Sequence, residues 1–300
     1  LKKHGFEIEA ASDGRIKIDH YPSMQLGGKP PELIGQAIDG VADIIWTVSG
    51  YTPGRFPHAE VFELPFMMSG ADAEAVSAAY WDMAQKYMVD GEFSEFHLLA
   101  SWVHGPGVIH SKDPIVTPED LQGVTLRAPS RVTNMMLSSM GATPIGMPVP
   151  AVPEALSKGV IDATIIPWEV TGALKVPELV SHHLEFGEGA LYTTTFLFAM
   201  NKDSYEAMPE DLRQILDENS GALLSAMAGK QMQLDDGPAR EAALDMGNEV
   251  TTLTPEQVAA WEAAAASTID TWIAEVAEKG MDGAALIEEA KALIAQYAAQ

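Results

Sequence analysis

One arginine stands where a protein would recognise a carboxylate. The run Val124–Ala128 alternates apolar and polar residues, so Arg127 points away from the apolar face of the strand that this pattern predicts. The strand ends directly before Pro129 and a helix start at Ser130. In parallel α/β sheets such strand ends face the ligand crevice, and a guanidinium offers a rigid fork of donors that matches a carboxylate. The alternative is an ion pair with one of the chain's many acids.

Three tryptophans and one histidine also stand at or next to the ends of predicted strands. They are Trp46, Trp102, Trp168 and His104. Each tryptophan suits either a flat pocket wall or the core, because tryptophan is largely buried in both roles. His104 can donate or accept a hydrogen bond, which serves a ligand pocket and a structural contact equally. Both interpretations stay open for all four residues.

Other residues with chemical potential give weaker patterns. Asp162 and Glu169 suggest an acid–base pair, but acids next to strands are more often structural caps. The run His182–Glu185 suggests a metal site, yet adjacent histidines point in different directions and metal ligands must converge. The nucleophile elbow, the Walker loop and the HExxH motif are missing, and Gly105–Gly107 does not continue as a dinucleotide fingerprint. We therefore expect no metal, no cofactor and no catalytic residue.

The elements that position these residues alternate between strands and helices over the first two thirds of the chain. The predicted strands are Arg15–Tyr21, Val41–Trp46, Leu98–Val103, Val108–His110, Val124–Ala128, Val160–Ile166 and Thr193–Met200, the last of which is the final clear strand. Helical periodicity covers Pro31–Asp39, Asp72–Val89 and Arg131–Met140. This alternation predicts α/β layers with mostly parallel sheets.

Helix caps sharpen several boundaries. Thr117–Asp120 and Thr254–Gln257 each place a capping residue before a proline at the first helical position, and Ser130 can cap the following helix. From Pro209 onward nearly everything is helical and rich in alanine, with stops near Gly247 and Gly280. A helical tail of this kind predicts helices laid across the α/β body.

Composition excludes several classes of function. The chain has 300 residues, enough for two domains, and a formal net charge of −25. That charge argues against nucleic acid and anionic membranes as partners, although solubility alone is a sufficient reason for it. There is no cysteine, which suits an oxidising compartment. The chain starts at Leu1 without a signal peptide, and Gly5–Ala11 is typical of the middle of a domain, so we expect a trimmed N-terminus.

Several motifs in order then give a resemblance that covers nearly the whole chain. They are Ser12–Ile16 with Tyr21–Pro22 and Gln25–Gly27, the "LPF" turn in Glu63–Phe66, Asp120–Pro129, Met140–Pro144, and Glu154–Leu156 followed by Gly159–Asp162. Together they resemble the periplasmic solute-binding subunits of tripartite ATP-independent (TRAP) transporters. The family's first strand normally precedes the region at which this chain begins.

The resemblance implies an α/β fold with two lobes, a ligand cleft between them, long C-terminal helices and closure on ligand. It implies that Arg127 pairs with the ligand carboxylate and that Val149, after Met147, lines the pocket. We place lobe I at residues 1–101 and 191–235 and lobe II at 102–190 and 236–300. The hinge strands lie near 101–104 and 188–193, and the hinge includes the long helix after Pro209.

Two departures from the family pattern concern the ligand. A second basic residue that many members carry falls near Pro106 here, and a polar amide falls on Ile166. A dicarboxylate or a sugar acid would lack partners, and burying unpaired polar groups is costly. We therefore expect a monocarboxylate with an apolar or aromatic body. The predicted ligand-binding residues are Arg127, Trp168, Val149, Trp46, His104, Met147, Phe66 and Ile166.

The sequence thus predicts a periplasmic binding protein that hands a small organic acid to the membrane components of a TRAP transporter. It predicts no enzyme activity, no nucleic-acid partner and no direct membrane insertion. One alternative is a two-lobed enzyme that acts on a small organic acid through Asp162, Glu169 or His104. Another is a binding protein that serves an ABC-type pump.

Overall fold

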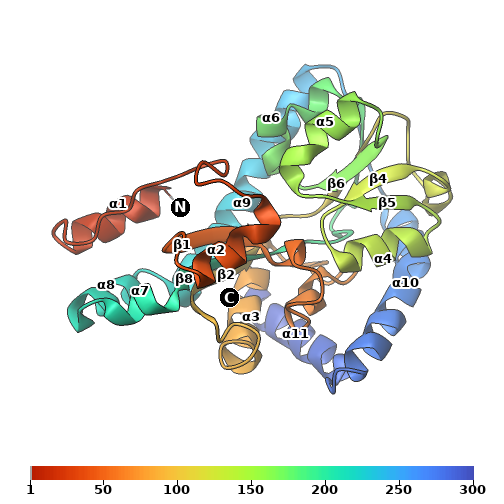
Figure 1. Cartoon of the computed structure of the whole chain (residues 1–300). Coiled ribbons are helices and arrows are strands. Elements are labelled where there is room, and N and C mark those ends of the chain that lie inside the picture. Colours follow the sequence, from red (N-terminus) through yellow and green to blue (C-terminus); the bar gives the residue numbers. More distant parts are fainter. Residues whose placement is uncertain (1) are drawn as a thin grey trace.

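The chain folds around two β-sheets, and its computed structural model describes residues 2–300 (Figure 1). Leu1, at which the predicted lobe I begins, lies outside the described residues. The three-stranded sheet has the order β1 (Ile44–Val48), β8 (Thr195–Asn201), β2 (Phe96–Val103). The six-stranded sheet has the order β5 (Thr143–Gly146), β4 (Thr125–Ala128), β6 (Ala163–Ile166), β3 (Val108–Ser111), β7 (His182–Glu185), β9 (Glu249–Thr252).

The expectation of mostly parallel sheets is wrong. Both pairings of the three-stranded sheet are antiparallel, and β3 is antiparallel to both of its neighbours in the six-stranded sheet. The connections explain the difference, because the chain leaves one sheet after β2 and returns from the other before β8. Strands pair in parallel where a helix lies between them in the chain, as between β4 and its neighbours β5 and β6. That parallel group carries Arg127.

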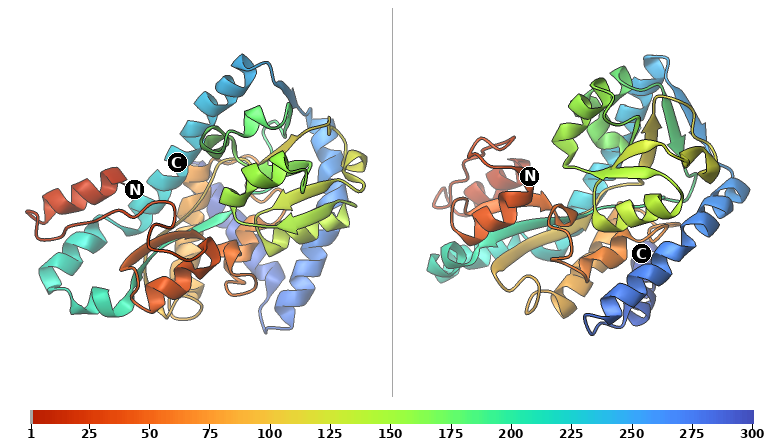
Figure 2. Two further views of the ribbon diagram at one scale, coloured as in Figure 1. Left: turned by 45° about the horizontal axis from the view of Figure 1, so that its top comes forward. Right: turned by 45° about the vertical axis from the view of Figure 1, so that its right-hand side comes forward.

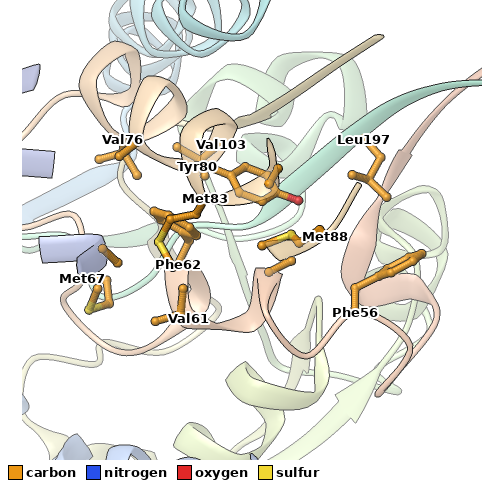
Figure 3. Close-up of a cluster of buried hydrophobic side chains, with 14 of the residues drawn as sticks. Phe56, Val61, Phe62, Met67, Val76, Tyr80, Met83, Met88, Val103 and Leu197 are labelled. Atoms are coloured by element: carbon orange, nitrogen blue, oxygen red, sulfur yellow. The ribbon is translucent and has the colours of Figure 1, made fainter. Parts of the chain in front are cut away.

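Helices cover the three-stranded sheet. Helix α3 (Ala73–Tyr87) begins at Asp72, whose side chain accepts a hydrogen bond from the Ala75 N–H, and it buries Val76, Tyr80 and Met83 at helical spacing. Figure 3 shows these side chains gathered with Phe62 in the core. Helix α9 (Gly221–Asp245) packs on both α3 and β2, and α2 (Leu33–Ile38) packs on β1.

The six-stranded sheet has its own core. Its apolar face includes Leu126 and Ile165, packed against Trp261 of helix α10 (Pro255–Ala277). Helix α4 (Arg131–Ser139) begins at the predicted cap, Ser130, whose side chain accepts a hydrogen bond from the Thr133 N–H. A second apolar cluster lies around helices α5 (Val152–Ser157) and α6 (Thr171–Leu174).

The long C-terminal helices contact both halves of the molecule. Helix α9 packs against α3 and also against the short turn η6 (Trp168–Val170) that follows β6. Helix α10 packs on α4, whereas α11 (Gly283–Ala298) packs on α3. Figure 2 shows α9 and α10 running between the two halves. The predicted helical tail is therefore confirmed, and the lobe boundaries stay a prediction.

Two element assignments need correction. The predicted strand Arg15–Tyr21 is not a strand, because Ile16 and Ile18 pack against the N-terminal helix α1 (Lys2–Ala11) and its neighbours instead of pairing with a sheet edge. The final strand is β9 and not the strand that contains Thr195–Met200, since the predicted stop at Gly247 is followed by pairing with β7. The remaining helices are α7 (Lys202–Ala207) and α8 (Glu210–Glu218). Among residues 2–300, no helix combines the length and the apolar character that crossing a membrane requires.

Candidate functional site

Arg127 lies at the carboxyl ends of three parallel strands, as its position in the sequence predicted. Its Nε donates a hydrogen bond to the Met147 carbonyl at 2.9 Å, beyond the end of β5, and its Nη1 donates to the Ile165 carbonyl of β6 at 3.0 Å. Only 2% of the residue is exposed. The two carbonyl contacts fix the guanidinium at the edge of the sheet where ligands of α/β proteins bind.

No acid neutralises this buried charge. Among residues 2–300, Arg127 forms no ion pair, which leaves the predicted alternative of a salt bridge without support. Burial lowers the pKa of Arg127, and the nearest groups that oppose this shift are the hydroxyls of Tyr51 and Tyr192. A guanidinium has five N–H donors, and the two carbonyls use two of them. Since a buried charge is costly unless it is paired, the arrangement favours an anionic ligand at Arg127.

Tyr51 links the two halves of the molecule beside Arg127. It ends the turn η2 (Ser49–Tyr51), which follows β1, and its hydroxyl oxygen accepts a hydrogen bond from the Val149 N–H at 2.9 Å. Its hydroxyl proton is therefore free to donate toward a ligand. Sequence reasoning missed Tyr51, although it stands only three residues beyond the end of a strand.

Tyr192 is the second hydroxyl near the guanidinium. The residue is 1% exposed, and its hydroxyl has no hydrogen-bond partner within the described part of the chain. Its ring packs so closely on Gly107 that a Cβ there would lie 2.1 Å from a ring carbon. Burial raises the pKa of Tyr192 while Arg127 opposes the shift. Gly107, which in the sequence stands only in an incomplete nucleotide motif, therefore leaves the space that the Tyr192 ring occupies.

His104 stands close enough to Arg127 for their charges to interact. Burial and, to a smaller extent, the charge of Arg127 together lower the pKa of His104 to about 4, so the ring is neutral at pH 7. Its Nδ1 lies 2.5 Å from the Gly105 carbonyl. Its ring meets the edges of Tyr192 and Phe196, with centroid distances of 5.5 and 6.1 Å.

An aromatic row leads from His104 to the surface. Phe196 stacks with Trp102 at 5.7 Å between ring centroids, and Trp46 lies 5.9 Å from Phe196 and 6.2 Å from Trp102. Trp102 is buried, whereas Trp46 is 47% exposed. The row offers flat apolar walls on the three-stranded sheet.

Three of the predicted ligand-binding residues meet in one apolar cluster. Ile166 is buried in it, and Met147 and Val149 pack against it. Two of them also contact the site through their backbones, since the Met147 carbonyl holds Arg127 and the Val149 N–H holds Tyr51. The predicted apolar residues therefore frame the guanidinium on the side of the six-stranded sheet.

Phe66 and Trp168 lie among other partners. Phe66 meets Phe186 edge to face at 6.0 Å and packs against the core of the six-stranded sheet. Trp168 packs on His110 and His183, and its indole N–H donates to Glu185 at 2.8 Å. Within residues 2–300, neither forms a hydrogen bond with Arg127. A role for either in binding stays a prediction.

Two residues of the enzyme alternative, Asp162 and Glu169, lie at opposite ends of β6. Asp162 precedes β6, is exposed and lies 3.5 Å from Lys112, whereas Glu169 follows the same strand at its other end. Glu169 lies beside Asp236, which accepts a hydrogen bond from its backbone N–H at 2.8 Å, and burial raises the pKa of both carboxyls to about 7. His183 lies beside His110, with their Nδ1 atoms 2.7 Å apart. An acid–base pair of Asp162 and Glu169 is therefore excluded by their positions.

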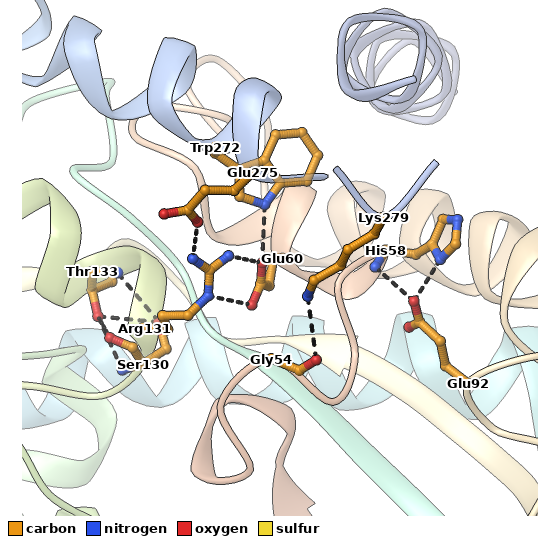
Figure 4. Close-up of polar contacts among 10 residues, drawn as sticks. All are labelled: Gly54, His58, Glu60, Glu92, Ser130, Arg131, Thr133, Trp272, Glu275 and Lys279. Carbon is orange, nitrogen blue, oxygen red and sulfur yellow. Dashed lines mark hydrogen bonds and ion pairs between the residues drawn. The ribbon is translucent and has the colours of Figure 1, made fainter. Parts of the chain in front are cut away.

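A second arginine, Arg131, joins the two halves near this site. It donates two hydrogen bonds to Glu60 of the turn η3 (Ala59–Glu63) and one to Glu275 of α10. The indole of Trp272 donates to the same Glu60 at 3.0 Å (Figure 4). One residue before Arg131, Ser130 touches Gly50 so closely that a Cβ on the glycine would lie 2.5 Å from its own.

Comparisons with known proteins agree with this geometry. A model of the family described as bacterial extracellular solute-binding protein, family 7, matches residues 1–275. Among curated proteins, the ectoine/5-hydroxyectoine-binding periplasmic protein UehA of Ruegeria pomeroyi is 27% identical over 304 residues, which cover 97% of this chain and 85% of that protein.

Two solved structures are more similar still. A TRAP solute-binding protein from Rhodoferax ferrireducens T118, in complex with copurified benzoate, is 47% identical with a TM-score of 0.96, over 99% of this chain and 92% of that one. A marine metagenome TRAP solute-binding protein specific for aromatic acid ligands, in complex with metahydroxyphenylacetate, is 45% identical with a TM-score of 0.95, over 99% and 93%. Both the predicted family resemblance and the predicted two-lobed α/β fold are confirmed.

Proposed function

This chain belongs to bacterial extracellular solute-binding protein family 7, as a solute-binding subunit of the TRAP type, and we propose that it captures an aromatic monocarboxylate and delivers it to a membrane transporter. Binding takes place in the periplasm, and the membrane components of a TRAP transporter receive the ligand. The chain neither inserts into the membrane nor binds nucleic acid.

The observation that carries the proposal is the buried guanidinium of Arg127. It is held by two backbone carbonyls, has no acidic partner among residues 2–300 and lies at the ligand-binding edge of a parallel sheet. An arginine kept in this state presents a fork of donors to a carboxylate. The hydroxyls of Tyr51 and Tyr192 supply further donors on the same side. All of these groups suit one carboxylate.

The surroundings disfavour a second acidic group on the ligand. The position of the family's second base falls near Pro106, and the position of its amide is the buried Ile166. His104 is neutral at pH 7, so it adds no positive charge. A second carboxylate would be buried without a counter-charge, which is costly. We therefore propose a monocarboxylate rather than a dicarboxylate or a sugar acid.

The body of the ligand is aromatic in this proposal. The row from His104 through Phe196 to Trp46 provides flat rings on one side, and the cluster that contains Met147 and Val149 provides apolar surface on the other. Rings of this kind line small-molecule pockets. The structural relatives that are 47% and 45% identical hold benzoate and metahydroxyphenylacetate, which supports the same class of ligand here.

We propose that closure of the two lobes accompanies binding. The lobes are residues 1–101 with 191–235 and residues 102–190 with 236–300, joined by hinge strands near 101–104 and 188–193 and by α9. The Tyr51 hydroxyl and the Val149 N–H meet across the two halves, so a ligand held from both sides stabilises the closed arrangement. Small-angle scattering should show a smaller radius of gyration once an aromatic acid is added, and an unchanged radius from an open start would contradict closure.

Calorimetric titration tests the ligand class. The panel is benzoate, phenylacetate, a branched-chain 2-oxo acid, succinate and galacturonate, and we expect an aromatic acid to bind most tightly. Tightest binding of succinate or galacturonate would overturn the proposal. Recovery of the bound acid chemically unchanged separates a binding protein from an enzyme of the same shape. Uptake of the acid into liposomes that hold the TRAP membrane components tests delivery.

A further inference from the structure

The hydrogen bonds of His104 determine which of its ring nitrogens carries the proton. Nδ1 lies 2.5 Å from the Gly105 carbonyl oxygen, which can only accept. The Thr193 hydroxyl lies 3.3 Å from the same nitrogen, but its own proton goes to the His104 carbonyl at 2.7 Å. Both contacts therefore require a proton on Nδ1. Because the buried ring is neutral at pH 7, Nε2 is an unprotonated acceptor.

This acceptor has no partner in the part of the chain that the structure describes. The contacts of the His104 imidazole are the two at Nδ1 and the ring edges of Tyr192 and Phe196, and none of them reaches Nε2. The residue is only 2% exposed, yet Nε2 is not among the fully buried polar atoms that lack a partner, so this nitrogen borders a space that an atom of water or ligand can enter. Once a bound ligand excludes water from this space, Nε2 carries a desolvation cost unless the ligand itself supplies the hydrogen bond.

The site places several hydrogen-bond donors around His104. Arg127 lies within electrostatic reach of His104, and the hydroxyls of Tyr51 and Tyr192 lie within reach of Arg127. A carboxylate accepts hydrogen bonds from all of these donors and offers none to Nε2. Nε2 is therefore complementary to a hydrogen-bond donor, which a simple aromatic carboxylate lacks.

We propose that Nε2 of His104 accepts a hydrogen bond from a hydroxyl group on the ligand, so that the chain prefers hydroxylated aromatic monocarboxylates to their unsubstituted counterparts. This inference rests on the proposed function and narrows its ligand class. A site built to bond a hydroxyl rejects the analogue without it, because the site's own polar atom is then left unpaired. His104 is in this account a specificity-determining residue, while Arg127 provides the affinity common to all the acids.

Matched pairs of ligands test the preference. Mandelate against phenylacetate places the hydroxyl next to the carboxylate, and 3-hydroxybenzoate against benzoate places it on the ring. We expect the hydroxylated member of at least one pair to bind about tenfold more tightly, the value of roughly one hydrogen bond. The pair that shows the gap locates the hydroxyl relative to Arg127.

Two variants assign the preference to Nε2. His104→Asn keeps a side-chain N–H for the Gly105 carbonyl but is too short to place an acceptor at the Nε2 position, and His104→Phe keeps a ring of similar size without either nitrogen. Both should bind the hydroxylated and unsubstituted acids with equal affinity, and circular dichroism checks that each variant is folded. His104→Gln, which can return an acceptor near the Nε2 position, should restore part of the gap.

The outcomes separate this inference from the proposed function. If aromatic acids bind but neither pair shows a difference in affinity, or if His104→Asn and His104→Phe retain that difference, then His104 does not recognise a ligand hydroxyl, while the proposed function stands. If no aromatic acid binds the wild-type chain, both are wrong. A gap of about tenfold that both variants abolish supports the inference.

Discussion

Arg127 and Arg131 are four residues apart, and their surroundings differ completely. Arg131 donates to Glu60 and Glu275, and these two acids raise its pKa. Arg127 is more deeply buried and meets only backbone carbonyls and tyrosine hydroxyls, while burial lowers its pKa. In a chain with 43 acidic and 18 basic residues, a buried arginine without an acid stands out.

Arg131 has its counter-charges within the protein, whereas Arg127 has none among residues 2–300. The Arg131 network joins η3, α4 and α10, so its charges are balanced within the protein. The Arg127 charge has no counter-charge among residues 2–300, and in the proposed function the ligand carboxylate supplies it. Glu63, the last residue of η3, is a third case: it is 2% exposed, and its Oε2 has no hydrogen-bond partner among residues 2–300. A carboxyl can resolve that problem by taking up a proton, whereas an arginine cannot release its own.

The largest effect on stability should come from Arg131→Met. It leaves Glu60, which is 8% exposed, without its main counter-charge, so the free energy of unfolding should fall by about 3–5 kcal/mol in urea denaturation. Arg55→Met is the control, because Arg55 pairs with the exposed Glu95 at 2.7 Å and such pairs contribute less than about 1 kcal/mol. Equal costs for the two variants would show that the network does not hold the fold.

Glu63→Gln should change how stability depends on pH. Burial raises the pKa of Glu63 from 4.5 to about 7, with Thr195 and Ser130 acting against the shift. The unfolded chain therefore loses this proton at a lower pH than the folded chain does. The contribution of Glu63 to the free energy of unfolding is fully present below about pH 4.5 and is lost as the pH rises through 7. The variant should match the wild type at pH 4.5 and exceed its free energy of unfolding at pH 8 by about 3 kcal/mol at most.

The same unfolding experiment at both pH values checks this prediction. Glu169 and Asp236, whose pKa values are also raised to about 7, stay in both proteins, so the difference between them reports Glu63 alone. A difference in unfolding free energy that is the same at pH 4.5 and pH 8 would contradict the raised pKa.

Arg127→Met should cost the ligand-free protein less than about 2 kcal/mol. It leaves two carbonyls without donors but also removes an unbalanced buried charge, and the two effects oppose each other. Urea denaturation of the ligand-free variant beside Arg131→Met is the measurement. A loss of unfolding free energy as large as that of Arg131→Met would mean that Arg127 stabilises the fold, as Arg131 does.

The smallest effect should come from Tyr51→Phe, which removes the acceptor for the Val149 N–H. One neutral hydrogen bond is worth about 0.5–1.5 kcal/mol, so affinity for an aromatic acid should fall by about two- to tenfold. Tyr87→Phe is the matched control, since its hydroxyl donates to Glu289 of α11, away from Arg127. If calorimetry shows the same affinity for both variants, Tyr51 does not contribute to ligand binding.

Much of this site could be predicted because its signals are local. Alternation in β4 and the cap at Ser130 placed Arg127 at a strand end, and the order of the family motifs gave the two-lobed fold. The cap of α10 at Thr254 was equally visible, since a capping box needs only four consecutive residues.

The remainder depends on contacts between distant segments. Tyr51 and Tyr192 are 141 positions apart and gain a role only because both fold next to Arg127. The antiparallel pairing of β3 and the late strand β9 follow from how the chain crosses between sheets, which periodicity does not record. The partners of Trp168, among them His183 and Glu185, are likewise brought together only by the sheet.

Calorimetric titration of Arg127→Ala with the aromatic acid that the wild type binds best tests whether Arg127 holds the ligand carboxylate. Removal of the guanidinium leaves the ligand carboxylate buried without its counter-charge, which costs about 2–5 kcal/mol, so affinity should fall by roughly 30-fold to several thousandfold while the variant stays folded. Arg55→Ala, at an exposed ion pair, serves as the control and should bind as the wild type does. Wild-type affinity in a folded Arg127→Ala protein would contradict the account.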